Sequence, residues 1–238
     1  MAAQSYPDVV PLAPPRSARE RIYLDLRGKL QRCEFDASDR LVDLDIAARF
    51  GTSRMPAREA LLQLVNEGYL IGTTRGFIVP VLTIDDVKDS FEVRKLLEPR
   101  AAGSAARDMD VDGQVALSEA ADHARAAADS HSFEKLVLAM IEFRAAWLGS
   151  VRNARLASTI ARFADHVQTV RLATLRDTAT QGLAADGLGQ LCSAFLRRDS
   201  LAVSDRMATH IAVAEHAFSM LHRSHDVVRE AEAVRCSN

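Results

Sequence analysis

Apolar positions in the first eighty residues repeat at helical spacing in three segments and then change to short β-prone runs. This pattern predicts helices at residues 17–32, 41–50 and 55–67. Two runs rich in β-branched and aromatic residues, 69–71 and 77–79, are separated by a glycine-containing turn and predict a small hairpin. Helix, helix, turn, helix and hairpin is the order of a winged helix-turn-helix, whose third helix enters the major groove of DNA.

Beyond residue 80 the strand signals end, and apolar residues repeat at spacings of three and four. Thr83 and Asp86 form a capping-box pattern at the start of a long helix. Further helices are predicted at residues 111–128, 132–151, 154–178, 182–197 and 200–224. We therefore expect a mainly α fold, in which a winged helix-turn-helix is followed by an all-α antiparallel bundle of about six helices.

Domain boundaries follow from these elements. Residues 16–80 are expected to form the winged helix-turn-helix domain, and residues 81–238 the helical domain. Residues 1–15 contain four prolines and little periodicity, which predicts a flexible N-terminal arm. No stretch approaches about 18 consecutive apolar residues, so we expect a soluble, cytoplasmic protein with no membrane partner.

Composition limits the kind of partner that the chain can bind. Hydrophobic residues make up 48% and charged residues 26%, as in ordinary globular proteins. The formal net charge is -2 and the pI is about 6.4, so any contact with nucleic acid must come from a local basic patch. Cys33, Cys192 and Cys236 share no spacing typical of a disulfide framework or a zinc site, which favours a reducing compartment.

A local basic patch occurs at residues 49–61, which contain three arginines and no acid before Glu59. Arg54 and Arg58 are four positions apart and share one face of the third predicted helix, where guanidinium groups can reach guanine edges or phosphates. Thr52 and Ser53 add hydroxyl donors at the start of that helix. A solvated basic face is the alternative, but the turn, the helix order and the hairpin favour contact with DNA.

The segment Phe50-Gly51-Thr52-Ser53-Arg54-Met55-Pro56-Ala57-Arg58-Glu59-Ala60-Leu61 resembles the recognition segment of the GntR family of bacterial regulators. The resemblance implies that the two arginines contact DNA bases or phosphates and that the wing tip lies in the minor groove. Met55 departs from the family pattern, which often has threonine there. The predicted DNA-binding residues are Thr52, Ser53, Arg54, Met55, Arg58, Arg75 and Gly76.

The C-terminal half resembles the FCD-type effector domain of the FadR-like branch of that family, through residues 91–98, residues 143–153 and the pattern that ends at His210 and Ile211. Metal sites in this family use one aspartate and three histidines. Here Met140, Arg144 and Leu188 stand at three of those positions, and only His210 is retained. A thioether, a cation and an alkyl group offer no comparable set of ligands, so we expect no metal and no other cofactor.

Arg144 instead offers a fixed positive charge suited to a carboxylate or a phosphate. We therefore predict a small anionic effector in this domain. The alternatives are ordinary structural roles, in which Arg144 is solvated or pairs with an acid of another helix, Arg94 pairs with Glu98, and His210 belongs to the core. The predicted effector-binding residues are Arg94, Met140, Arg144, Trp147, Leu188 and His210.

These features predict a DNA-binding transcription regulator that is a homodimer on double-stranded operator DNA and is controlled by a small metabolite. A dimer is expected because one short recognition helix reads too few base pairs to select a genomic site. The main alternative is a DNA-binding dimer whose helical domain has lost its ligand. An enzyme is disfavoured because the sequence has no nucleophile elbow, phosphate-binding loop or zinc-protease motif.

Overall fold

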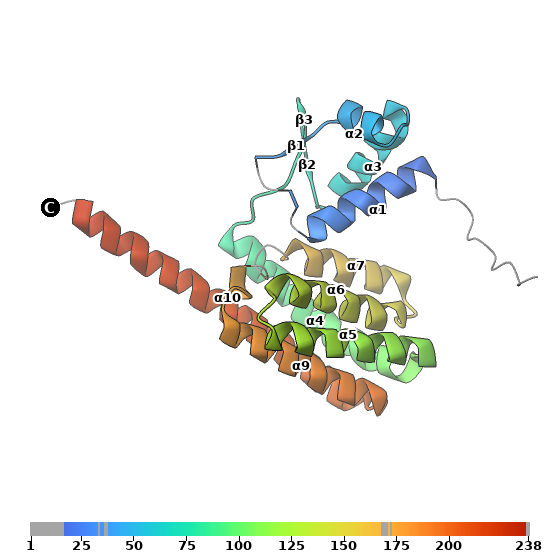
Figure 1. Ribbon diagram of the computed structural model, residues 1–238, viewed down its shortest axis with the longest axis vertical. Coiled ribbons are helices and arrows are strands. Elements are labelled where there is room, and N and C mark those ends of the chain that lie inside the picture. The colour runs from blue at the N-terminus through green and yellow to red at the C-terminus, as the bar shows by residue number, and fades with distance from the viewer. Residues whose placement is uncertain (1–16, 33, 36–37, 168–170, 172, 237–238) are drawn as a thin grey trace, which may run out of the picture. The chain divides into compact units, whose positions relative to one another are not determined.

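The computed structural model describes residues 17–32, 34–35, 38–167, 171 and 173–236, with side chains as far as His222. It divides into two compact units (Figure 1). The first unit contains the chain up to Leu30 together with Phe35–Pro80, and the second contains residues 31–34 and the chain from Val81 onward. The predicted N-terminal arm, residues 1–15, lies outside the described residues.

The first unit is a winged helix-turn-helix. Its elements are α1 (Ala18–Gln31), β1 (Arg40–Leu41), α2 (Asp43–Arg49), α3 (Arg54–Asn66), β2 (Ile71–Thr73) and β3 (Gly76–Ile78). The strands form an antiparallel sheet in the order β1-β3-β2, with Leu41 opposite Phe77. Fully buried residues of α1 and α3, among them Ile22, Leu26 and Leu61, pack into one apolar core with the start of the wing.

Two of the predicted boundaries in this unit are wrong. The helix predicted at residues 41–50 begins only at Asp43, because Val42 is extended and Leu41 belongs to a strand that pairs with β3. The first wing strand begins at Ile71 rather than at residue 69, because Tyr69 and Leu70 are buried in the core instead of pairing in the sheet.

The tip of the wing requires a glycine. Gly76 has φ of +130°, which side chains rarely adopt, and a Cβ there would lie 2.6 Å from the carbonyl oxygen of Leu41. The hydroxyl of Thr73 accepts a hydrogen bond from the amide of Arg75 and donates one to the carbonyl of Gly76. The turn of the hairpin is thereby fixed on both sides of Arg75.

The second unit is a bundle of helices. Its described helices are α4 (Ile84–Asp108), α5 (Val111–Asp129), α6 (Phe133–Gly149), α7 (Ala154–His166), α9 (Thr178–Leu196) and α10 (Ser200–Cys236). Figure 1 shows them in green to red. α4 begins with the predicted capping box, in which Thr83 and Asp86 accept hydrogen bonds from each other's backbone amides. Small buried residues of α4, such as Ala102 and Ala106, let its neighbours approach closely.

Three predicted helices in this unit need correction. The segment 154–178 is not one helix, because α7 ends at His166 and Asp177 caps a new helix by accepting from the amide of Thr180. α9 therefore starts at Thr178 and not at residue 182. α10 continues to Cys236, beyond the predicted end at 224. No helix in the described part of the chain combines the length and hydropathy needed to cross a membrane.

Candidate nucleic-acid interface and ligand cavity

The start of α3 presents two arginines to solvent. Gly51, with φ of +60°, makes the turn between α2 and α3, and Ser53 follows in an extended conformation at the N-cap. The Ser53 side chain makes no capping hydrogen bond among the described residues. The side chains of Arg54 and Arg58 are 62% and 59% exposed. They lie one helical turn apart, in the position that the recognition helix of this fold uses to reach base edges.

Asp43 of α2 joins these two arginines. One guanidinium nitrogen of Arg54 lies 3.0 and 3.2 Å from the two oxygens of the Asp43 carboxylate, and a nitrogen of Arg58 lies 3.5 Å from it. The Asp43 side chain is only 8% exposed. The sequence analysis missed Asp43, because no helical spacing shows that a residue of one helix meets two residues of the next.

The other predicted DNA-binding residues belong to the same unit. Met55 is 65% exposed on the first turn of α3, and Thr52 is half-buried before it. On the wing, Arg75 is exposed and Gly76 is half-buried at the tip. Recognition helix and wing tip thus each carry an exposed cationic side chain, as contact with a phosphate backbone requires.

The second unit contains a cavity with two chambers, which share Arg94, Met140, Arg171 and His210 in their walls. The polar chamber has about 340 Å³ of space between its atoms, and the apolar chamber has about 560 Å³, in part open to solvent. All six predicted effector-binding residues line the polar chamber: Arg94, Met140, Arg144, Trp147, Leu188 and His210. The apolar chamber is lined further by Phe91, Val167, Thr174, Leu175, Thr180, Ala184, Val213, Ala214 and Ala217.

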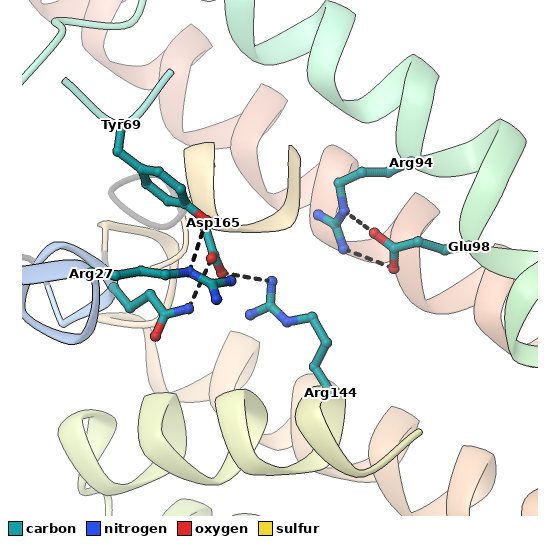
Figure 2. A network of polar contacts seen from close by, with 7 residues as sticks. Arg27, Tyr69, Arg94, Glu98, Arg144 and Asp165 are labelled. Atoms are coloured by element: carbon teal, nitrogen blue, oxygen red, sulfur yellow. Dashed lines mark hydrogen bonds and ion pairs between the residues drawn. The ribbon is translucent and has the colours of Figure 1, made fainter. Parts of the chain in front are cut away.

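Two ion pairs lie at the polar chamber (Figure 2). Nε of Arg94 is 2.5 Å from the Glu98 carboxylate, and a second nitrogen is 3.4 Å from it. A guanidinium nitrogen of Arg144 is 3.5 Å from Asp165 of α7, and both side chains are nearly buried. Arg94 and Arg144 therefore form the ion pairs that the sequence analysis named as the alternative to ligand binding, and both side chains also line the cavity.

Arg171 and His210 complete the polar surroundings. Burial lowers the pKa of Arg171 well below its ordinary value, and the positive charges of Arg144 and Arg94 lower this pKa further. Burial lowers the pKa of His210 to about 4, helped by Arg94 and Arg171. His210 is therefore neutral at pH 7 and adds no positive charge for an anion. The sequence analysis missed Arg171.

The donors at this cavity do not fit a divalent metal ion. Among the described residues, no group of three or more His, Cys, Asp and Glu side chains lies close enough to hold one. Arginines surround His210, and their positive charge disfavours a metal cation beside it. The Nδ1 atom of His210 also lies 2.9 Å from the position that a Cβ on Gly187 would occupy. The charged side chains around His210 are thus mainly guanidinium groups, which cannot act as metal ligands.

A winged helix-turn-helix followed by a helical domain with an internal cavity defines the architectural class of this protein. The model of the bacterial regulatory proteins of the gntR family matches residues 18–77, and the model of the FCD domain matches residues 89–213, more than half of the chain. The chain belongs to the GntR family of bacterial transcription regulators, and its second unit is an FCD domain.

Known proteins support the same assignment. The chain is 38% identical over 68 residues to the Nta operon transcriptional regulator of Aminobacter aminovorans, and 29% identical over 96 residues to the transcriptional repressor RspR of Escherichia coli. These matches cover 28% and 40% of this chain, and 32% and 42% of the relatives' own length. The chain thus matches less than half of either relative.

Among solved structures, the fold is similar to that of E. coli McbR/YncC, with a TM-score of 0.75 at 19% identity, over 89% of this chain and 100% of that one. A GntR regulator from Rhodococcus sp. RHA1 has a TM-score of 0.67 at 20% identity, over 85% of this chain and 96% of that one.

Proposed function

We propose that this protein is a homodimeric, DNA-binding transcription regulator whose affinity for its operator changes when a small anionic molecule binds the cavity of the FCD domain. The exposed Arg54 and Arg58, held on Asp43 at the start of the recognition helix, carry the DNA-binding part of the proposal. Guanidinium forks on the face of such a helix bind guanine edges and phosphates.

A cavity favours the sensor over a domain that only dimerises. Protein interiors are close-packed, and a domain without a ligand gains stability when its core is filled. Here the interior of the FCD domain instead keeps two adjoining chambers, one lined mainly by apolar side chains and one that adds the buried Arg144 and Glu98. Fixed cations in such a cavity favour an anionic ligand.

DNA binding is tested with the double variant Arg54→Ala/Arg58→Ala. We expect operator affinity to fall by on the order of 1–3 kcal/mol for each arginine that reads a base, and the salt dependence of binding to become less steep. A control that removes two exposed arginines of the FCD domain, Arg100→Ala/Arg155→Ala, should bind like the wild type. Equal operator affinity of both double variants in gel-shift titrations would contradict the proposal.

We also propose that the cavity of the FCD domain binds no metal ion. We expect elemental analysis of the purified protein to find less than stoichiometric zinc, nickel and manganese, because the chambers offer guanidinium groups in place of a ligand set. Dialysis against a chelator should leave operator binding and its response to an effector unchanged. A stoichiometric metal that a chelator removes, with loss of the response, would contradict this part.

A further inference from the structure

Met55 is an exposed apolar residue on the side of α3 that faces away from the core. Its side chain is 65% exposed, and it is not among the described residues that pack against the apolar core of the first unit. With 3.6 residues per helical turn, Met55 lies about 180° around the helix from the fully buried Leu64. A methionine therefore stands near the middle of the outward face of the recognition helix.

The two recognition arginines flank Met55 along the helix. Arg54 precedes it directly, and Arg58 follows within one turn, about 60° from it around the helix axis. Both arginines are mostly exposed and form ion pairs with Asp43. Isolated exposed apolar residues are common on protein surfaces and need no explanation. Met55 differs from such residues, because the docking that brings Arg54 and Arg58 to the bases also covers the side chain between them.

The chemistry of methionine limits which base it can favour in the major groove. Its thioether donates no hydrogen bond and accepts one only weakly. Against a guanine, adenine or cytosine edge it would displace water from donors and acceptors without replacing their hydrogen bonds. Thymine presents an apolar group there, its 5-methyl group, which packs against apolar side chains. The unbranched, flexible methionine side chain can adapt to the position of that methyl group.

We propose that Met55 recognises thymine by packing against its 5-methyl group, beside the guanine edges or phosphates that Arg54 and Arg58 contact. Each half-site of the operator then contains a thymine within the few base pairs that the start of α3 covers. This rests on the proposed function and deepens it, because it assigns a base preference to one residue of the recognition helix.

The first test removes the methyl group alone. Operator duplexes are selected from random DNA with the full-length protein, and each thymine of one half-site is replaced in turn by deoxyuridine, which keeps the base pair and its hydrogen-bonding groups. We expect one of these replacements to weaken binding of the wild type about three- to fivefold, the effect of leaving one methyl group uncovered. Equal affinity for all these duplexes, or a selected half-site without thymine, overturns the proposal.

Two variants then assign the methyl contact to one side chain. Met55→Ala should bind the thymine and deoxyuridine duplexes with equal affinity, because the contacting group is gone. Leu62→Ala is the matched control, since Leu62 is 43% exposed on the same face of α3 and lies about 10 Å farther along the helix, beyond the N-terminal residues that contact bases. It should keep the wild-type preference. A Met55→Ala protein that still prefers thymine, or a Leu62→Ala protein that does not, overturns the proposal.

The failure of this inference can be distinguished from failure of the proposed function. Gel shifts of the Arg54→Ala/Arg58→Ala variant with the same selected duplexes report operator binding as such. If this variant loses the operator that the wild type binds, while deoxyuridine has no effect on the wild type, only the inference about Met55 is overturned. If the wild type prefers no sequence over unrelated DNA, the proposed regulator is overturned, and base recognition by Met55 with it.

Discussion

Asp43 shows how one buried carboxylate organises an exposed surface. Its side chain is fixed at the start of α2, while the two arginines that it contacts, Arg54 and Arg58, are mostly exposed. A long side chain in solvent loses conformational freedom when it binds, and an ion pair that orients it beforehand reduces this loss. We infer that Asp43 is a positioning residue for the recognition arginines.

The variant Asp43→Asn separates orientation from charge. Affinity for the specific operator should fall about tenfold, because the guanidinium groups of Arg54 and Arg58 lose the ion pair that orients them. Affinity for unrelated DNA should stay equal or rise, because one negative charge near the phosphates is lost. Asp45→Asn, an exposed site on the same helix, makes the same charge change and should keep the specificity ratio. A parallel fall for both kinds of DNA in fluorescence-anisotropy titrations would refute the positioning role.

At the scale of single residues, the sequence analysis identified the candidate site residues through their spacing along one helix and through family resemblance. The residues predicted on α4, α6, α9 and α10 all line the polar chamber. Asp43 and Arg171 were missed because each acts across elements: Asp43 on the next helix, and Arg171 on arginines of α4 and α6. Such contacts depend on how helices pack, which periodicity along the chain does not contain.

At the scale of elements, α4 and α10 cross where α4 has a glycine. A Cβ at Gly103 would overlap the hydroxyl of Ser204 and lie 2.7 Å from the backbone oxygen of Ser200. The Ser200 hydroxyl donates to the carbonyl of Gly103, and the Ser204 hydroxyl donates to the carbonyl of Pro99 one turn earlier. The two helices are therefore held by hydrogen bonds that need this close approach.

The same substitution should have opposite effects at two glycines. Gly103→Ala is expected to lower the free energy of unfolding by about 1–3 kcal/mol, because the backbone oxygen of Ser200 cannot yield as a side chain can. Gly189→Ala should raise it by about 0.5–1 kcal/mol, because beyond the neighbouring backbone of α9 itself no described atom lies within 4 Å of the added methyl group, and alanine favours a helix. Urea unfolding of the full-length variants measures both; equal signs would contradict this account.

The elements that the sequence predicted wrongly are those decided by distant partners or by a single cap. Leu41 fits helical spacing, but its backbone pairs with Phe77, thirty-six positions away, so local pattern favours the wrong element. Between α7 and α9 the apolar period continues, yet the Asp177 side chain starts a new helix at Thr178. The helix α5 was predicted to within one residue, and the capping box at the start of α4 was predicted correctly, because local spacing and caps determine these features.

For the whole molecule, the proposed homodimer explains how a short recognition helix can select an operator. The recognition helix α3 has 13 residues, and only its first turns carry the exposed Arg54 and Arg58. Such a helix reads a few base pairs, whereas a genome offers on the order of 10⁶–10⁹ competing sites. A symmetric dimer doubles the number of base pairs that are read and requires an inverted repeat whose half-sites face the same side of the duplex.

We therefore expect selection from random DNA with the full-length protein to return inverted repeats whose half-site centres lie about 10 base pairs apart, or a multiple of this spacing. Duplexes of equal length with one half-site scrambled should bind about a hundredfold more weakly, because one set of arginine contacts is lost while the non-specific phosphate contacts remain. Adding five base pairs between the half-sites should weaken binding as strongly, since it rotates one half-site by half a helical turn. Light scattering of the complex should give two chains per duplex. Selection of single, unrepeated sites, or equal affinity for the full and the scrambled duplex, would show that one copy suffices and that the dimer is not the unit of recognition.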